Sequence, residues 1–298
     1  MNAWEPIAAT READDAPAAW RITRPPPGAP RTPLVFASPH SGRIYPQSMM
    51  SASQLSAQAI RRSEDAYVDE LIDGAPAHGA MVIAARVARV YLDVNREPWE
   101  LDPQMFADEL PPYARGRSAR VAAGLGAIAR IVCEGQEIYD RKLTFAEASG
   151  RVDAVHRPYH DTLAALIAET RDAHGLAILF DWHSMPAAAA AQASSGAGCD
   201  MVLGDRYGGA CSPAVCRLVE RELAALGYEV ARNAPYAGGY TTEHYGRPAR
   251  RVHALQIEVN RALYLDETTL APTAGFAALK ENLERLFARL SGVNWAAA

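Results

Sequence analysis

Two histidines follow apolar, strand-like runs and share the same local sequence. His40 lies in SPHSG, after the run LVFA, and His183 lies in DWHSM, after the run LAILFD. A histidine in such a place can be a hydrogen-bonded turn residue, a general base or a metal ligand. Because ligands of open parallel sheets bind beyond the carboxyl ends of the strands, histidines at two strand ends can meet in space. We therefore interpret the two histidines as a pair.

A carboxylate would complete a metal site, because two imidazoles and one carboxylate form a common catalytic zinc set that leaves a fourth position for water. The nearest acids after the first histidine lie in RRSEDAYVDEL. Here Ser63 is a predicted helix N-cap, which places Glu64 and Asp65 in the first turn. Asp65 and Asp69 are four residues apart and share one helix face. The third ligand is open among these three acids, and a capped surface helix with acids on its wet side is the alternative.

Cations and hydrogen-bonding side chains gather at the end of another strand-like run, in ARVARVYLDVNREP. The run ends at Asp93, with Asn95 and Arg96 after it and Arg89 before it. The planar guanidinium of arginine suits bidentate binding of a carboxylate or polarisation of a carbonyl oxygen. An internal salt bridge between Asp93 and an arginine is the alternative, and both can hold at once.

Glu258 lies inside the otherwise apolar run ALQIEV. A carboxylate buried there must be paired, bound to a metal or raised in pKa, because burying an unpaired charge is costly. A general base beside a metal site would have this environment. A salt bridge to Arg251 or Arg261 is the structural alternative.

The elements that must position these residues alternate between apolar β-branched runs and amphipathic stretches, which predicts an α/β fold with a mostly parallel, buried sheet. The predicted strands are 34–37, 81–87, 90–94, 176–181, 201–204 and 254–259. The predicted helices are about 64–77, 152–173, 212–226 and 275–290.

The flanking and connecting segments have distinct compositions. Residues 1–33 end in the proline-rich stretch TRPPPGAPRTP and are predicted to form a surface arm, with a single domain over 34–298. The small-residue stretch 187–198 directly follows the second histidine and is predicted to be a flexible loop and a candidate lid.

Composition, charge and the first residues of the chain indicate what kind of partner and location to expect. The chain has 298 residues, a formal net charge of −5 and no apolar run of eighteen residues, so we expect no membrane insertion and no nucleic-acid partner. Its acidic start is unlike a signal peptide, so we expect a cytoplasmic protein with a small-molecule partner. Four cysteines without a paired CxxC leave metal binding to histidine and carboxylate. The oligomeric state is left open.

Nine short motifs in one order resemble the N-formylglutamate amidohydrolase family. They span about residues 34–290 and are SPHSG, EDAYVDEL, LDVNREP, GLGAIAR, IYDRKL, RPYHDTL, DWHSMP, GGYTTEHYG and QIEVNRALYLDE. The family is related to the zinc carboxypeptidase and aspartoacylase group. The resemblance implies a three-layer α/β fold of the zinc-carboxypeptidase or phosphorylase-hydrolase kind, with a mostly parallel or mixed central sheet and helices on both faces.

The resemblance also implies roles for individual residues. It implies His40, Asp65 and His183 as ligands of one zinc ion or another transition metal, although the compact motif of the related group has an acid where this chain has Arg43. It implies Glu258 as general base and Arg89 as the residue that polarises the scissile carbonyl. The substrate-binding residues that it suggests are Asn95, Arg96, Tyr240, Thr241, Thr242 and His244. Arg130 and Arg247 are further candidates, because the dianionic product of the implied reaction suits a site with several arginines.

The implied reaction is hydrolysis of N-formyl-L-glutamate to formate and glutamate, with a place in histidine degradation. Three alternatives stay open. One is a deacylase or small peptidase that acts on another N-acyl amino acid on the same scaffold. The second is a metal-independent serine hydrolase that uses Ser41 or Ser184, although no G-x-S-x-G motif occurs. The third is a non-catalytic ligand-binding relative.

Overall fold

The computed structural model describes residues 18–114, 116, 118–132, 135–193 and 198–297. Residues 1–17 of the predicted arm and 194–197 of the predicted lid lie outside this range. The chain forms two compact units. One comprises His40–Glu64 and Ala85–His160 with the described residues through Arg21, and the other comprises Ile22–Pro39, Asp65–Ala84 and Asp161–Ala298. The single domain over 34–298 stays a prediction.

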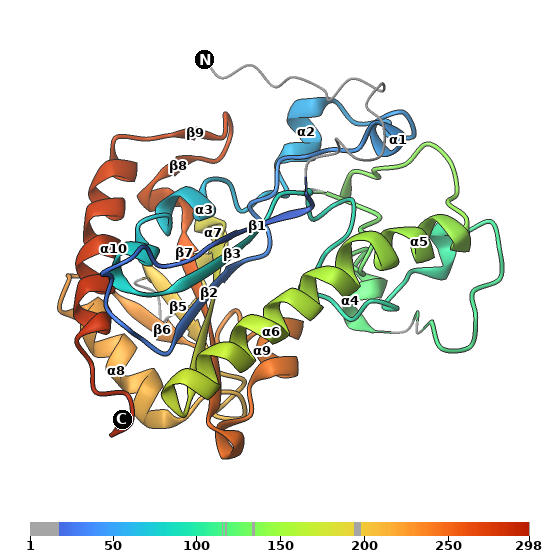
Figure 1. Ribbon diagram of the computed structural model, residues 1–298. Helices are drawn as coiled ribbons and strands as arrows, with labels where there is room; N and C mark the ends of the chain where they lie inside the picture. Colours follow the sequence, from blue (N-terminus) through green and yellow to red (C-terminus); the bar gives the residue numbers. More distant parts are fainter. Residues whose placement is uncertain (1–17, 115, 117, 133–134, 194–197, 298) are drawn as a thin grey trace. The chain divides into compact units, whose positions relative to one another are not determined.

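A seven-stranded mixed sheet forms the centre of the fold (Figure 1). Its order is β1 (Trp20–Thr23), β3 (Met81–Ala85), β2 (Leu34–Ser38), β4 (Ala177–Met185), β7 (Val252–Asn260), β5 (Met201–Gly204) and β6 (Val230–Arg232). Strand β2 pairs in parallel with β3 and β4, and β4 pairs in parallel with β7. Strand β5 runs antiparallel to β7. The predicted α/β class with a mixed central sheet is confirmed.

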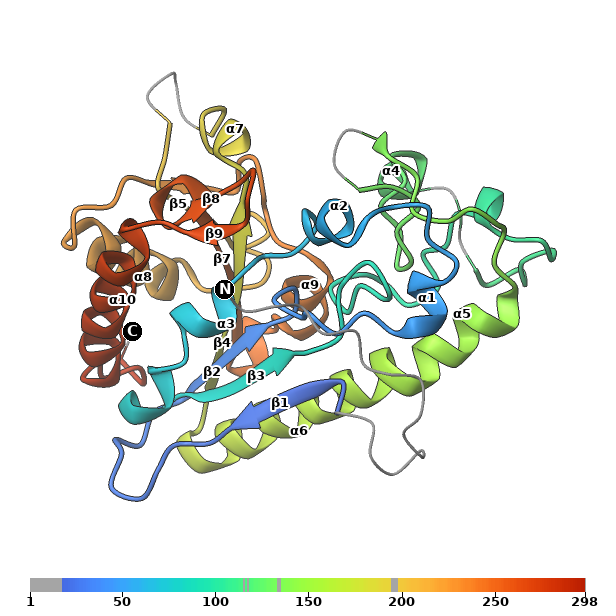
Figure 2. The ribbon, with the colours of Figure 1, turned by 90° about the horizontal axis from the view of Figure 1, so that it is seen from above.

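Helices flank both faces of the sheet (Figure 2). One face packs against α3 (Val68–Leu71), α8 (Pro213–Ala224) and α10 (Gly275–Ser291), while α6 (Arg157–His174) runs along the other. Aromatic rings join the first face to α10. The ring of Phe287 lies 5.2 Å from that of Phe36 and 5.9 Å from that of Trp182, centroid to centroid, and all three side chains are fully buried.

The unit that contains residues 85–160 consists mainly of turns and short helices. The helices are α1 (Gln47–Met50), α2 (Ala57–Arg61), α4 (Ala119–Ala122) and α5 (Phe145–Arg151), and a π-helical turn at Val152–His156 leads into α6. A capping box fixes the start of α5, because Thr144 and Glu147 each accept a backbone N–H of the other. Buried side chains such as Met49, Leu101 and Leu143 supply the apolar packing.

Two predicted elements are wrong. Residues 90–94 form turns rather than a strand, and polar contacts of Asp93 replace strand pairing there. Of the predicted helix over 64–77, only α3 (Val68–Leu71) forms an α-helix, and a 3-10 helix follows at Ala75–His78. The α-helix starts no earlier than Val68, because Tyr67 directly before it has a left-handed backbone with φ of 62°. The Ser63 hydroxyl donates to the Ile60 carbonyl oxygen and is no N-cap.

Other predicted elements agree with the structure, and several short ones were not foreseen. The predicted strands at 34–37 and 201–204 correspond to β2 and β5, and the four-residue helix α7 (Ala187–Ala190) occupies the start of the predicted loop. Strands β1 and β6, helix α5 and helix α9 (Tyr240–Tyr245) had no counterpart in the prediction. These elements are short, so their periodic patterns carry little signal.

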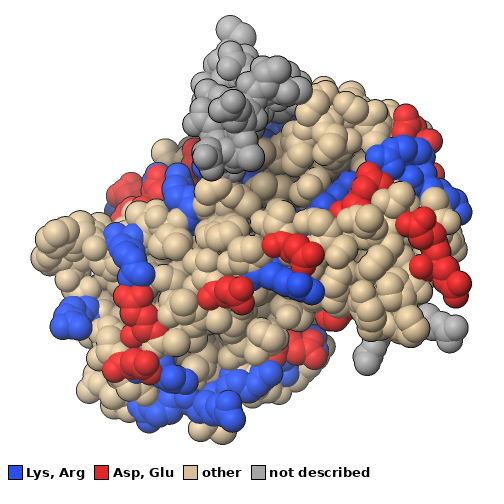
Figure 3. Space-filling model, turned by 45° about the vertical axis from the view of Figure 1, so that its right-hand side comes forward, with Lys and Arg blue, Asp and Glu red and all other residues tan. Residues whose placement is uncertain are grey.

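Charged side chains of both signs are interspersed on the face of the molecule shown in Figure 3. Exposed ion pairs such as Arg285 with Glu281, at 2.6 Å, follow helical spacing. None of the helices in the described part of the chain combines the length and the apolar character that crossing a membrane would need.

The aromatic cluster provides a test of the core. Replacing Phe287 by alanine removes a fully buried ring that touches two other rings, so we expect a loss of about 3–5 kcal/mol in the free energy of unfolding. Urea unfolding at pH 7 measures it. The exposed Arg285→Ala on the same helix is the control and should cost about 0.5 kcal/mol or less. Equal losses in the two variants would contradict this packing.

Candidate active site

Four polar side chains interrupt the apolar pattern on adjacent strands of the sheet. In the parallel pairing of β4 with β7, Asp181 lies opposite Gln256 and His183 lies opposite Glu258. All four are at least 94% buried. Since side chains alternate along a strand, these four share one face, while the intervening Trp182 joins the apolar core on the other. A buried polar group in this place requires partners within the protein or a ligand.

His183 lies between two aspartates. Its Nδ1 is 3.1 Å from Oδ2 of Asp65, and its Nε2 is 3.1 Å from Oδ2 of Asp181. Burial alone would lower the pKa of this imidazole, but the negative charge of Asp181 and hydrogen bonds to both aspartates raise it well above its usual value, with a further contribution from Glu258. The negative potential that favours a proton here also favours a metal cation.

Asp65 is held by a buried arginine. Arg261 Nη2 donates to Oδ1 of Asp65 at 2.9 Å, and its Nε donates to the Ser184 hydroxyl at 3.0 Å. The Tyr264 hydroxyl donates to the backbone oxygen of Ala66 at 2.9 Å. Although burial would lower the pKa of Arg261, the charge of Asp65 raises it, so the guanidinium stays charged. One oxygen of Asp65 thus binds the arginine while the other faces His183.

Asp93 holds His40 in a similar way. Nε2 of His40 lies 2.7 Å from Oδ1 of Asp93, which also accepts the backbone N–H of Asn95 at 2.8 Å. Arg89 donates to the other oxygen at 2.8 Å. Burial would raise the pKa of Asp93, but the positive charges of His40, Arg89 and Arg96 hold it well below its usual range. The internal salt bridge considered from the sequence is therefore present, between Asp93 and Arg89.

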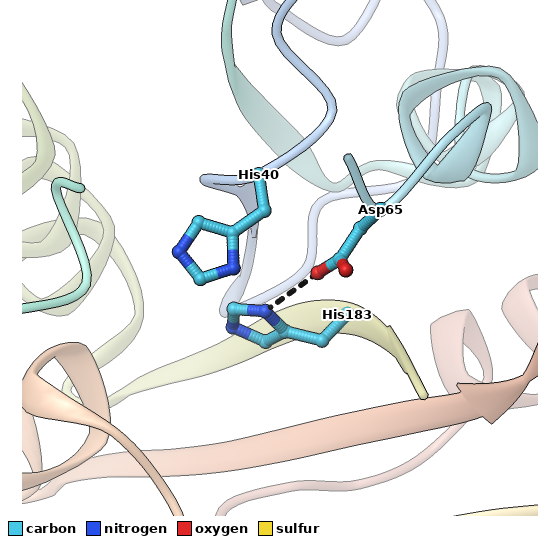
Figure 4. A group of neighbouring side chains, drawn as sticks. All are labelled: His40, Asp65 and His183. Carbon is cyan, nitrogen blue, oxygen red and sulfur yellow. Dashed lines mark hydrogen bonds and ion pairs between the residues drawn. The ribbon is translucent and has the colours of Figure 1, made fainter. Parts of the chain in front are cut away.

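His40, Asp65 and His183 form one group of possible metal ligands (Figure 4). Each offers one ligand atom, these atoms all lie within 4.8 Å of one another, and all three residues are buried. Two imidazole nitrogens and a carboxylate oxygen fit the donor preferences of zinc. Of the other two acids considered from the sequence, Glu64 accepts hydrogen bonds from Tyr45 at 2.7 Å and Arg61 at 2.9 Å, and Asp69 lies within α3.

The segment around Asn95 is fixed by two histidines that the sequence analysis did not single out. His160 Nε2 donates to the Val94 carbonyl oxygen at 2.7 Å, and His156 Nε2 donates to that of Arg96 at 2.9 Å. Their rings pack with centroids 4.4 Å apart. The sequence signals were their spacing of four residues within a predicted helix and the place of His160 in the motif RPYHDTL. They hold the backbone on both sides of Asn95, a predicted substrate-binding residue.

The other predicted substrate residues lie on or just after α9, or in the unit that contains residues 85–160. On α9, the ring of Tyr240 stacks on that of His244 at 5.0 Å, while Thr241 and Thr242 are fully buried. Arg130 pairs with two acids, at 2.9 Å from Asp102 and 3.2 Å from Glu137. The side chain of Arg96 donates to the backbone oxygens of Asn95 and Leu125, and that of Arg247 donates to those of Glu243 in α9 and Gly246. Contact of any of these residues with a substrate stays a prediction.

Comparisons with known proteins agree with the motifs. Residues 32–265 match the family model described as N-formylglutamate amidohydrolase. The chain belongs to the N-formylglutamate amidohydrolase family. It is 31% identical to an N-formylglutamate deformylase of Pseudomonas aeruginosa over 254 residues, covering 84% of this chain and 88% of the relative. It is 29% identical to a deformylase of the same name from Pseudomonas putida over 241 residues, covering 80% and 84%.

Of two similar solved structures, one belongs to the same family and the other shares the fold. The crystal structure of an N-formylglutamate amidohydrolase from Ralstonia eutropha superimposes with a TM-score of 0.85 and 37% identity, covering 92% of this chain and 97% of that one. A protein of Agrobacterium tumefaciens shares the fold with a TM-score of 0.55 at 18% identity, covering 92% and 95%. The predicted family is thus confirmed.

Gly42 provides a test of how the His40 segment is placed. The segment runs close to residues 86–88, and a Cβ on Gly42 would lie only 2.1 Å from the Val87 carbonyl oxygen. We expect Gly42→Ala to lower the free energy of unfolding by about 1–3 kcal/mol. Because His40 is one of the three possible metal ligands, the substitution should also weaken the binding of added zinc by about tenfold or more.

Urea unfolding and competition titration with a zinc chelator measure the two effects. Gly150→Ala is the matched control, because a Cβ at that position in α5 meets nothing within 4 Å and alanine favours a helix. The control should keep zinc affinity and gain up to about 1 kcal/mol in stability. A Gly42→Ala protein with native stability and zinc affinity would rule out the close approach described here.

Proposed function

We propose that this protein is a zinc-dependent amidohydrolase that cleaves N-formyl-L-glutamate to formate and L-glutamate. The observation that carries the proposal is the buried group of two histidines and one aspartate in a chain of the N-formylglutamate amidohydrolase family. The names of the relatives support the substrate, because two of them are N-formylglutamate deformylases. A cytoplasmic location and a place in histidine degradation remain expectations of the family resemblance.

His40, Asp65 and His183 would hold the metal ion. Nε2 of His40 faces Asp93, and Nε2 of His183 faces Asp181. We therefore assign Nδ1 as the ligand atom of both imidazoles. The aspartates fix the tautomer of each ring and increase its basicity, as carboxylates behind metal-binding histidines do. Arg261 would orient Asp65 and reduce its freedom to rotate. When bound, zinc would supply Lewis acidity that activates water and polarises a carbonyl oxygen.

Glu258 is the proposed general base. It lies directly opposite His183 in the β4–β7 register, and its side chain is 6% exposed. In the proposed reaction it removes a proton from the attacking water, which adds to the formyl carbon. It then delivers a proton to the amide nitrogen, so the C–N bond breaks to give formate and the amine of glutamate. One carboxylate thus serves as base and then as acid.

Arginines would bind the charges of the substrate. We assign Arg89 to the negative charge that develops on the formyl oxygen, and Asn95 with Arg96 to a carboxylate of glutamate. Asp93 supports this arrangement, because it binds the Arg89 side chain and the Asn95 backbone at once. Burial lowers the pKa of Arg96 from its usual value, which fits a guanidinium that an anionic substrate would stabilise.

Metal removal tests the dependence on zinc. Dialysis against a chelator should abolish hydrolysis of N-formyl-L-glutamate, and addition of one equivalent of zinc should restore it. Metal analysis of the untreated protein gives the identity of the native ion. Full activity in metal-free protein would refute the zinc proposal and favour a serine hydrolase, whereas turnover of only another N-acyl amino acid or a dipeptide would refute the substrate.

Glu258→Gln tests the general base. The variant keeps the size of the side chain but cannot accept a proton, so we expect kcat to fall by about 10²–10⁴-fold while one zinc ion per chain is retained. Formate release and metal analysis measure the two quantities. Glu229→Gln, outside the proposed machinery, should leave kcat unchanged. A Glu258→Gln enzyme with native kcat would remove Glu258 from this role.

A further inference from the structure

We propose that Gln256 is a positioning residue that fixes the Glu258 carboxylate and joins it to the start of α9. This inference rests on the proposed function. Gln256 is two residues before Glu258 on β7 and therefore projects from the same face of the sheet. Its side chain lies between the proposed general base and the helix that carries four of the predicted substrate residues.

Hydrogen bonds determine how the Gln256 amide is turned. The backbone N–H of Gly239 lies 2.8 Å from Oε1 of Gln256 and can only donate, so Oε1 must accept. The amide NH₂ must then point the other way, where its nitrogen lies 2.7 Å from Oε1 of Glu258. An NH₂ group can only donate, so Glu258 accepts at this oxygen.

This contact also restricts the orientation of the carboxylate. The terminal torsion of a glutamate has a broad energy minimum, so the carboxylate can rotate widely when nothing holds it. The bond from Gln256 holds one of its two oxygens at a defined place. Proton transfer depends strongly on orientation, and a displacement of about 1 Å can reduce a rate by about 10²-fold. Gln256 would thus affect kcat without touching the substrate.

The second contact fixes the loop before α9. Gly239 is the N-cap of this helix, and no side-chain cap bond is present there. The N–H groups at a helix start need acceptors from outside the helix. Gln256 accepts the N–H of the N-cap residue itself, at a position only 5% exposed. Loss of this bond should loosen the helix that starts with Tyr240, and so weaken substrate binding.

Two substitutions separate the effect of the contact with Glu258 from that of the contact with Gly239. Gln256→Glu keeps an acceptor for the Gly239 N–H but places a carboxylate against Glu258. We expect its kcat for N-formyl-L-glutamate to fall by about 10–100-fold while KM changes less than about threefold. Gln256→Leu removes both contacts, so kcat should fall and KM should rise. Gln58→Leu, at an exposed position of α2, is the matched control and should leave both constants unchanged.

A double-mutant cycle tests whether Gln256 acts through Glu258. Glu258→Asp shortens the side chain and should remove the contact with Gln256. If the contact carries the effect, Gln256→Leu should lower kcat much less in the Glu258→Asp enzyme than in the native one. Zinc content and thermal unfolding are measured for every variant, so that only folded, metal-loaded proteins are compared.

The outcomes distinguish a failure of the proposed function from a failure of the proposed role of Gln256. If native enzyme does not hydrolyse N-formyl-L-glutamate, the proposed function fails. If native enzyme is active and Gln256→Leu has native kcat, or lowers kcat equally in both backgrounds, the role of Gln256 is refuted. Loss of kcat in Gln256→Glu with KM retained, together with a non-additive cycle, supports it.

Discussion

The candidate site depends on the register of two parallel strands. Strands β4 and β7 pair over nine residues each, which places Asp181 and His183 opposite Gln256 and Glu258. A shift of one residue in a strand would exchange the two faces of that strand. Its polar side chains would then point into the apolar core, and its apolar side chains would point to the polar face. The aromatic and aliphatic residues between them, including Trp182 and Ile257, are fully buried on the other face. Core packing therefore fixes which residues can take part in chemistry.

The charges on this polar face favour a cation there. Asp65, Asp181 and Glu258 all act on His183, and the pKa of its imidazole is raised despite full burial. Arg261 compensates one of these carboxylates through a bond of 2.9 Å to Asp65. Buried charges persist only when they are paired or coordinate a metal. The acidic groups around this histidine thus support the proposal of a metal ion at the group of His40, Asp65 and His183.

The sequence predicted the strands that carry the site but not the local geometry between them. Long apolar runs identified β2, β4 and β7, since a buried strand leaves a strong pattern. The pattern failed at 90–94, where Asp93 accepts the Asn95 N–H and makes a turn. It also failed at Tyr67, whose left-handed backbone delays α3. Both failures come from side-chain and backbone interactions that periodicity cannot report. The contact of Gln256 with the backbone of Gly239, a loop residue, is another interaction of this kind.

The antiparallel direction of β5 determines where the chain connects β4 to β5. Because β5 runs antiparallel to β7, Met201 at its start pairs with Val259 near the end of β7. The chain therefore leaves β4 and enters β5 at the same edge of the sheet, with no need to cross its face. A connection whose ends are anchored at one edge can gain or lose residues without shifting either strand. A related chain can therefore change the length of this connection while β4, β5 and His183, a proposed metal ligand, keep their positions.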